Sequence, residues 1–382
     1  MANVNQIYSM VNDAASEALG KSAITAKDTG TLVSLGNQVF SSDTNKEQFY
    51  KALTNRIGRT VIAVREYAAK TRAVKRDELE WGAIYQKISY KWKDATSNAS
   101  WETATQANPF DVEIGTEAVQ KLFSVIGTYS YEDSIPDYQL FTAFTSASAM
   151  GAYISGIYTN MKNALEVADE NLANLAVSTN IAGVLKKGKA TQKRNLLAEY
   201  KTISGDATIT VATALTNPNF IKYATREIKT VIDNMTKMST LYNAETDIPR
   251  HTPSDKAVVE ILGLFASASD TYLQADTYHK ELVALPNYEK VVYWQAAGTS
   301  FNFEDVSKIN ITNSNIDAGA VEQGGILAFV HDVDSCASII YRRRSHSIYN
   351  PRAERYNIFE KADKGFAVDL SENAVVFYIA EA

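Results

Sequence analysis

Residues 331–336, His-Asp-Val-Asp-Ser-Cys, bring together side chains that readily hold a metal ion. A neutral imidazole, carboxylates and a thiolate are all effective ligands for zinc and related ions. The segment also follows directly after an apolar run expected to be a strand, where a polar turn is ordinary. Because no CxxC or HExxH spacing accompanies it, we favour the structural turn over a metal-dependent enzyme site. The candidate ligands are His331, Asp332, Asp334 and Cys336.

The sharpest cluster of charge is a run of three arginines, Arg342, Arg343 and Arg344. Guanidinium groups bind carboxylates and phosphates through paired hydrogen bonds. The formal net charge of the chain is −6, so no general basic surface favours nucleic-acid binding. We therefore predict that these arginines form ion pairs, within the chain or between subunits, rather than contacts with nucleic acid.

A second basic segment lies between residues 51 and 76. It contains eight lysines and arginines, among them Arg56 and Arg59, against the single acidic Glu66. Such a run usually forms a solvated face, and we favour that interpretation. The alternative is a patch that meets an acidic surface on a neighbouring copy, or nucleic acid.

Other signatures of chemistry are missing from the sequence. The basic loop at 186–195 lacks the glycine spacing of a dinucleotide site and the Lys-Ser/Thr ending of a phosphate-binding loop. No Gly-x-Ser-x-Gly motif marks a nucleophile, and the single cysteine excludes an internal disulfide framework. No apolar run reaches the roughly 18 residues that span a bilayer, and no secretory signal is expected. We predict no catalytic residue, no cofactor, no metal and no membrane association.

The elements that position these residues include a strand at 80–93. Ile88, Tyr90 and Trp92 lie on one face at a period of two, and lysines occupy the other face. A return strand is expected around 112–114. A projecting two-stranded ribbon is only marginally stable alone, so its aromatic face needs a partner. That partner is either the chain's own core or a neighbouring copy.

One very long helix is predicted after this ribbon. Residues 137–217 contain no proline, and apolar residues between 150 and 175 recur at steps of three and four. A helix over about 145–184 would be on the order of 60 Å long. A helix of this length favours a spine along one domain.

The remaining segments predict a mixed α+β architecture. Residues 1–60 are too polar for a core of their own, so we expect them to lie as an arm on something else. Helices are expected at 220–242 and from 254 through 264. Short strands are expected at 290–294, 325–330, 337–341, 365–370 and 373–379.

Several short segments then occur in a specific order along residues 50–380. They are 55–61 (NRIGRTV), 80–88 (EWGAIYQKI), 108–110 (NPF), 136–140 (PDYQL), 170–173 (ENLA) and 348–352 (IYNPR). Together they resemble the major capsid proteins of tailed bacteriophages with the Hong Kong 97 capsid fold, closest to those of short-tailed phages of Gram-positive and gut bacteria.

The resemblance implies an α+β protomer of the Hong Kong 97 type with a spine helix. The implied parts are an N-terminal arm at 1–60, an extended β-loop region at 61–116, a peripheral domain with the spine helix at 117–200, an axial domain at 201–340 and a C-terminal return to the peripheral domain at 341–382.

The same resemblance implies a structural subunit of the virion, without catalysis, that assembles in the host bacterial cytoplasm. Hexamers and pentamers would close an icosahedral head around double-stranded DNA, which is contacted non-specifically. A separate scaffolding protein, a portal and decoration proteins are the expected partners. The candidate intersubunit residues are Ile88, Tyr90, Trp92, Arg56, Arg59, Arg342, Arg343 and Arg344.

Two rival functions stay open from the sequence alone. An encapsulin-type protein compartment shares this fold but holds enzymes in place of DNA. A metal-dependent enzyme would use the cluster at His331, and metal analysis of the purified chain would distinguish it from a shell subunit.

Overall fold

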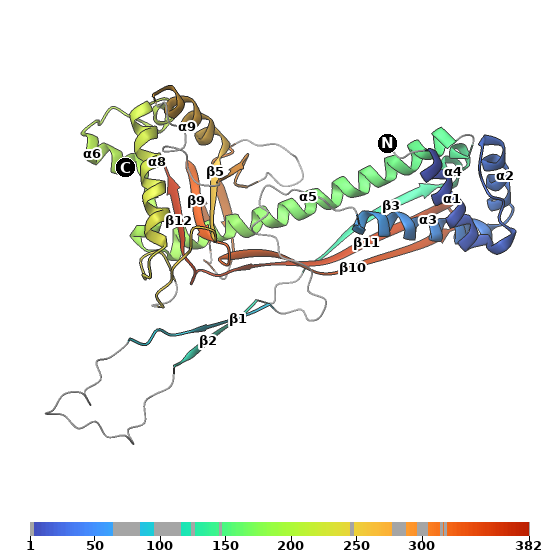
Figure 1. Ribbon diagram of the computed structural model, residues 1–382, viewed down its shortest axis with the longest axis horizontal. Coiled ribbons are helices and arrows are strands. Elements are labelled where there is room, and N and C mark those ends of the chain that lie inside the picture. Colours follow the sequence, from blue (N-terminus) through green and yellow to red (C-terminus); the bar gives the residue numbers. More distant parts are fainter. Residues whose placement is uncertain are drawn as a thin grey trace, which may run out of the picture.

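A computed structural model gives the fold of the chain at residues 4–63, 85–94, 116–123, 127–144, 147–244, 248–276, 288–295, 305–313, 316 and 319–381. The helix α5 (Ala147–Lys187) runs along the molecule between two ends of different construction (Figure 1). One end carries the helices α1–α4, and the other carries a sheet covered by helices. The helix therefore acts as the spine that the sequence predicts.

The length of α5 follows from its sequence. It spans 41 residues, or roughly 60 Å at 1.5 Å per residue. It ends where the amide of Gly188 donates to the carbonyl of Val184 at 2.8 Å. Two lysines in the last turn, Lys186 and Lys187, face the negative end of the helix dipole.

A long antiparallel hairpin runs beside α5 (Figure 1). The hairpin sheet has the strand order β10 (Cys336–Asn350), β11 (Arg355–Val368), β3 (Gly127–Pro136). Lys364 of β11 is 1% exposed and pairs with Asp169 of α5, and Arg343 Nη2 lies 3.6 Å from the other oxygen of that carboxylate. Since an uncompensated buried charge is costly, this cluster holds the helix and the hairpin in one arrangement.

The helical end of the molecule forms around the tip of the hairpin. Its helices are α1 (Val4–Leu19), the short 3-10 turn η1 (Gly20–Ser22), α2 (Thr29–Val39), α3 (Asp43–Ala63) and α4 (Asp137–Ala143). Asp28 caps α2, because its carboxylate accepts from the backbone amide and the hydroxyl of Thr31. Buried side chains of this core include Val11, Leu32, Leu35, Phe49, Leu53, Leu140, Phe144, Tyr349 and Tyr356.

The N-terminal region therefore has a partner that the sequence did not predict. The ring of Tyr50 in α3 stacks on that of Tyr356 in β11, with centroids 4.6 Å apart. The hydroxyls of Tyr50 and Tyr349 donate to the two oxygens of Asp137, at 3.0 and 2.7 Å. Burial and the Asp137 carboxylate raise the pKa of Tyr349 to about 12. Within the described subunit, the core side chains between residues 8 and 53 thus pack on the chain's own hairpin tip.

The opposite end contains the body sheet, whose described strands lie in the order β4, β12, β9, β5, β6. Their bounds are β4 (Lys193–Asn195), β12 (Ala374–Tyr378), β9 (Ile326–Asp332), β5 (Ala257–Leu262) and β6 (Tyr288–Val291). One face packs against α6 (Leu196–Ser204), α8 (Pro218–Met235) and α9 (Gly263–Asp276), and the other packs against α5. Smaller elements beside it are the 3-10 turn η4 (Ala190–Gln192), α7 (Val211–Ala214), β7 (Ile309–Thr312) and β8 (Ala320–Gln323).

The helix predicted from 254 through 264 is wrong. Residues Ala257–Leu262 form β5, a strand in the interior of the body sheet. The run contains the β-branched residues Val258, Val259 and Ile261, which favour a strand that is covered on both faces. Helix α9 begins only at Gly263. The sheet also takes strands from three of the predicted segments, since β4, β5 and β12 lie in 117–200, 201–340 and 341–382.

Another two-stranded sheet is the ribbon, in which β1 (Tyr85–Tyr90) pairs with β2 (Ala118–Phe123) (Figure 1). Tyr85 lies opposite Phe123, and Tyr90 lies opposite Ala118. The first strand was predicted, but its partner follows the predicted return strand in the sequence. Residues 112–114 themselves lie outside the described part of the chain.

Candidate assembly surface

The ribbon presents its apolar face to the outside of the subunit. Ile88, Tyr90 and Trp92 are 54%, 64% and 55% exposed, and Leu122 on the facing strand is 58% exposed. Ile88 and Tyr90 alternate with Lys87 and Ser89, which are only partly exposed. This arrangement reverses the usual one for a strand that packs on its own core. The apolar face is therefore uncovered within the described subunit.

The polar face of the ribbon contacts the body, which we define as the body sheet, the helices that pack on it and the turn between β11 and β12. Lys87 Nζ lies 2.7 Å from Asp369 Oδ2 and 2.7 Å from Glu372 Oε1. Lys121 Nζ lies 2.8 Å from Asp369 Oδ1. Both carboxylates belong to the turn between β11 and β12, and the Asp369 side chain is only 3% exposed. Ion pairs thus hold the ribbon on the body.

Arg250 completes these contacts. Its Nη2 donates to Ser89 Oγ at 2.7 Å, and its Nε lies 3.4 Å from Glu372 Oε1. Phe123, at the body end of β2, adds an apolar contact with a small cluster that includes Ile339. We refer to the charged contacts as the ribbon anchor: Lys87, Lys121, Arg250, Asp369 and Glu372.

The electrostatics of the ribbon anchor favour its charged state. Burial raises the pKa of the Asp369 carboxyl, but the charge of Lys87 and hydrogen bonds from Lys121, Lys87 and Ser371 outweigh it and hold that pKa well below its ordinary value. Burial lowers the pKa of Lys87, but the Asp369 and Glu372 carboxylates more than offset this effect and raise it. Both partners are therefore ionised at neutral pH.

Tyr90 and Trp92 also form one side of a groove of about 460 Å³ between the ribbon and the body. The other side includes Met238, which is 48% exposed, and Pro249. The indole Nε1 of Trp92 donates to Asp94 Oδ1 at 2.7 Å, and the side chain is 55% exposed. The exposed aromatic surface of the ribbon is thus continuous with the exposed apolar surface of the body.

The three arginines of β10 are placed differently from one another. Arg344 Nη2 binds Asp363 Oδ1 at 2.5 Å, and Arg343 contacts Asp169 as described above. Arg342 is exposed. The prediction of ion pairing is confirmed within the chain for Arg343 and Arg344.

The two candidate arginines of the basic segment lie on α3. Arg56 and Arg59 fall within its last two turns. Their side chains lie outside the part of the chain that the structure describes. Their assignment as intersubunit contacts stays a prediction.

Residues 331–336 form the turn between β9 and β10, in which His331 and Asp332 are buried and Asp334 is exposed. His331 is 0% exposed, its Nδ1 lies 2.8 Å from Ser335 Oγ, and its ring stacks on Phe329. Asp332 accepts a hydrogen bond from Thr252 Oγ1 at 2.7 Å and another from the amide of Asp334 at 2.9 Å. Within the described residues, no three His, Cys, Asp or Glu side chains gather closely enough to hold a metal ion. The structural turn is confirmed, and the arrangement of the described residues does not favour the metal-site alternative.

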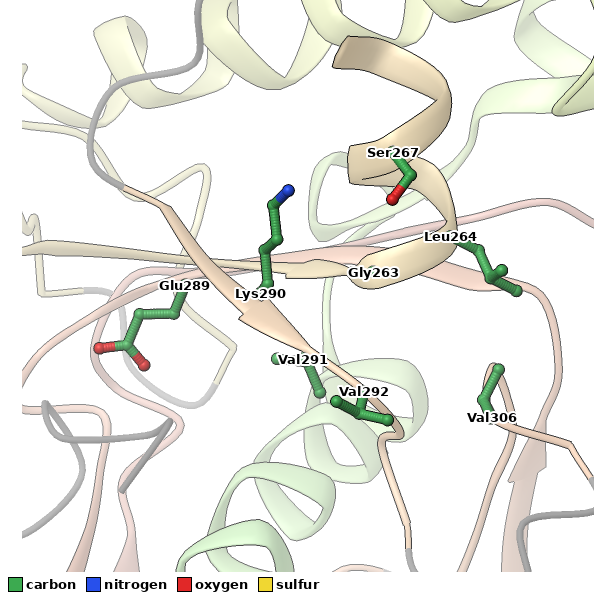
Figure 2. Close-up of a pocket in the computed structure, with 8 residues that line it drawn as sticks. All are labelled: Gly263, Leu264, Ser267, Glu289, Lys290, Val291, Val292 and Val306. Carbon is green, nitrogen blue, oxygen red and sulfur yellow. The ribbon is translucent and has the colours of Figure 1, made fainter. Parts of the chain in front are cut away.

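A second groove, of about 880 Å³, lies between α9 and β6 (Figure 2). Its lining is mostly apolar, with Leu264 and Val292 exposed. Glu289 and Lys290 point to different sides of β6, and Lys290 Nζ binds Asp270 at 3.2 Å. Among the described lining residues, the polar groups do not converge on a reacting position. Among the described helices, none is long and apolar enough to cross a membrane.

Comparison with protein-family models matches residues 9–378 to the family described as Phi29-like phage major capsid protein. This chain belongs to that family. The capsid protein is therefore a structural subunit of a phage head shell, it associates with copies of itself, and its place is the virion. The enzyme and encapsulin alternatives are not favoured.

Solved capsid structures share the fold. The chain is similar to a protein in the capsid structure of Staphylococcus phage Andhra, with a TM-score of 0.53, 9% identity, and coverage of 81% of this chain and 84% of that one. It is also similar to a chain in the structure of the head fiber and inner core protein gp22 of native bacteriophage P68, with a TM-score of 0.52, 11% identity, and coverage of 80% and 83%. Comparison with curated proteins found no match. The predicted Hong Kong 97-type capsid fold is thus confirmed.

Sequence reasoning missed the ribbon anchor. It placed the lysines of β1 on the face opposite the aromatic one, but alternation alone does not say which face contacts the body. Asp369 and Lys121 are 248 positions apart, and Arg250 and Ser89 are 161 apart. The acidic pair Asp369 and Glu372 beside a predicted strand end was a visible signal, but nothing in the sequence linked it to the ribbon.

Proposed function

We propose that this capsid protein assembles as hexamers and pentamers into an icosahedral head that encloses double-stranded DNA. Assembly takes place in the host bacterial cytoplasm, with a separate scaffolding protein, a portal and decoration proteins as partners. The packaged DNA is contacted without sequence preference. Membership of the capsid family supports this proposal, since a shell is built from many copies of one chain.

The observation that carries the assembly mechanism is the outward apolar face of the ribbon. Three of its side chains, Ile88, Tyr90 and Trp92, are each more than half exposed. Exposed apolar surface of this kind, flanked by polar groups, marks a site of protein–protein contact. Tyrosine and tryptophan are also the residues that most often dominate the binding energy of interfaces. We assign this face to contact with a neighbouring subunit.

The arginine candidates divide according to their partners. Arg343 and Arg344 contact carboxylates of their own chain, so their structural contacts favour an intrachain role. Arg342 is exposed on the same strand and is the better candidate for an intersubunit ion pair. Arg56 and Arg59 remain candidates because they lie on a segment with one acidic residue among eight basic ones.

We also propose how the described elements divide among the domains of a capsid subunit. The body sheet with α6, α8 and α9 is assigned to the axial domain, and α5 with the hairpin sheet is assigned to the peripheral domain. The helical end supplies the N-terminal part, and the ribbon is the body end of the extended β-loop region.

The test compares the same substitution at two exposed isoleucines. Ile88 lies on the ribbon and Ile203 on α6, and they are 54% and 66% exposed. We expect Ile88→Ala to reduce particle yield about tenfold or more and Ile203→Ala to leave it unchanged, as seen by sedimentation and electron microscopy of the full-length protein co-expressed with its scaffolding and portal proteins. Equal yields from both variants would contradict the assignment of the ribbon face.

A further inference from the structure

The register of the ribbon places two positive charges opposite each other, and a carboxylate of the body compensates them. Lys87 of β1 lies directly opposite Lys121 of β2. Like charges that face each other across an antiparallel pair destabilise it. Both lysines point to the same face, and the ribbon contains no carboxylate between them at that position. The two strands therefore pair less well alone than their apolar residues would allow.

Asp369 supplies the missing negative charge from the body. One carboxylate oxygen lies 2.7 Å from Lys87 Nζ and the other lies 2.8 Å from Lys121 Nζ. The carboxylate is held in place by its own turn, because Oδ1 accepts from the amide of Ser371 at 3.0 Å and from its hydroxyl at 2.6 Å. A rigid acceptor on the body thus bridges one cation from each strand of the ribbon.

The second acidic residue extends this bridge along β1. Glu372 Oε1 lies 2.7 Å from Lys87 Nζ and 3.4 Å from Arg250 Nε. Arg250 in turn donates to Ser89 Oγ, two residues along the same face of the strand. These contacts fix the rotation of β1 about its own axis, so that Lys87 and Ser89 face the body.

We propose that Asp369 is a positioning residue for shell assembly: by bridging Lys87 and Lys121 it closes the ribbon and docks it with the apolar face turned outward. This inference rests on the proposed intersubunit role of that face. Asp369 acts through the two lysines on the placement of Ile88 and Tyr90. Pairing of the ribbon and its docking on the body are thereby coupled.

The experiment measures amide hydrogen exchange in the unassembled full-length protein. Asp369→Asn removes the charge but keeps the shape of the side chain. We expect exchange in β1 and β2 to rise about tenfold or more, since a charge-assisted hydrogen bond contributes enough for such a change, while β5, β9 and β12 stay protected. Adding Lys121→Met to Asp369→Asn removes the repulsion and should restore protection of the strand pair.

A matched control lies on the same ribbon. Lys91 pairs with Glu117 at 2.6 Å, but both side chains are more than half exposed and neither belongs to the body. We expect Lys91→Met to change ribbon exchange by less than about threefold. Unchanged ribbon exchange in Asp369→Asn, or loosening of the body strands without rescue by Lys121→Met, would overturn the positioning role.

Assembly of the same variants separates this inference from the proposed function. Loosened ribbon strands with loss of particles support both. Loosened strands with normal particles support the role of Asp369 in closing the ribbon, but they contradict its role in assembly and remove the ribbon face from the assembly mechanism. Loss of particles with unchanged ribbon exchange overturns the positioning role and leaves the proposed function standing.

Discussion

At the helical end of the molecule, Phe49, Tyr50 and Tyr356 lie in contact within one core, whereas Ile88, Tyr90 and Trp92 of the ribbon are each more than half exposed. Both regions place aromatic and aliphatic side chains along one face of an element. At the helical end the hairpin tip of the same chain covers that face. On the ribbon, ion pairs hold the opposite face, and the apolar side stays open.

The difference separates residues that fold the subunit from residues that join subunits. A covered face contributes its burial free energy to the folding of one chain. An uncovered face contributes only when a neighbouring copy arrives. Substitutions at the helical end should therefore lower the free energy of unfolding, whereas substitutions on the ribbon should reduce particle formation.

The largest effect is expected in the helical core. Phe49 is 0% exposed and its ring lies 5.8 Å from that of Phe144. Phe49→Ala should lower the free energy of unfolding by about 3–5 kcal/mol through lost burial and a cavity. Denaturant unfolding of the unassembled protein measures this loss. A change below about 1 kcal/mol would show that this core does not stabilise the subunit.

A somewhat smaller loss is expected at the junction of α5 with the hairpin. Lys364→Met leaves the Asp169 carboxylate buried without its Lys364 partner, which should cost about 3 kcal/mol in the same measurement. The double variant Lys364→Met with Asp169→Leu removes both charges and should recover most of the loss. If the double variant is less stable than Lys364→Met, the two charges are not coupled as the structure implies.

Substitutions on the apolar face of the ribbon should weaken subunit association more than they lower the free energy of unfolding. Trp92→Ala should change the free energy of unfolding by less than about 0.5 kcal/mol, because the side chain is 55% exposed. It should weaken subunit association by about 2 kcal/mol, as expected for an aromatic residue at the centre of an interface. The dependence of particle formation on protein concentration gives that value. A large loss of folding stability would place Trp92 in the core of its own subunit.

The smallest effect is expected from pH. The lowered pKa of Asp369 means that its contribution is complete above about pH 4 and is lost as the pH falls further. The raised pKa of Lys87 means that its contribution is complete below about pH 10 and is lost at higher pH. Ribbon protection, corrected for intrinsic exchange, should stay constant within about twofold between pH 5 and 10. A transition within this range would contradict the account, because the lowered pKa of Asp369 and the raised pKa of Lys87 both lie outside it.

The sequence predicted those parts of the fold that depend on local pattern. The steps of three and four between residues 150 and 175 placed α5 closely, and alternation at Ile88 and Tyr90 placed β1. Alternation defines two faces of a strand but not which one is covered. That choice depends on Asp369 and Glu372, which come near the ribbon only through the turn between β11 and β12.

The packing of the helical end and the turn at His331 also depend on contacts between residues far apart in the sequence. The helical end was expected to be an arm because its own helices are polar, and the apolar surface that covers it comes from residues 135–165 and 349–358. The cluster at His331 had suitable ligand types, but the folded chain turns them toward Ser335 and Thr252 as hydrogen-bond partners. Long-range contacts decide both, and a single sequence contains no record of them.

The most direct test of the account is a cryo-electron microscopy reconstruction of assembled shells, in which the ribbon of each subunit is traced against its neighbours. The account predicts that Ile88, Tyr90 and Trp92 lie in van der Waals contact with an adjacent copy while Lys87 and Lys121 stay bound to Asp369 of their own chain. A shell in which the three apolar side chains face solvent, or in which the lysines face the neighbour, would contradict it.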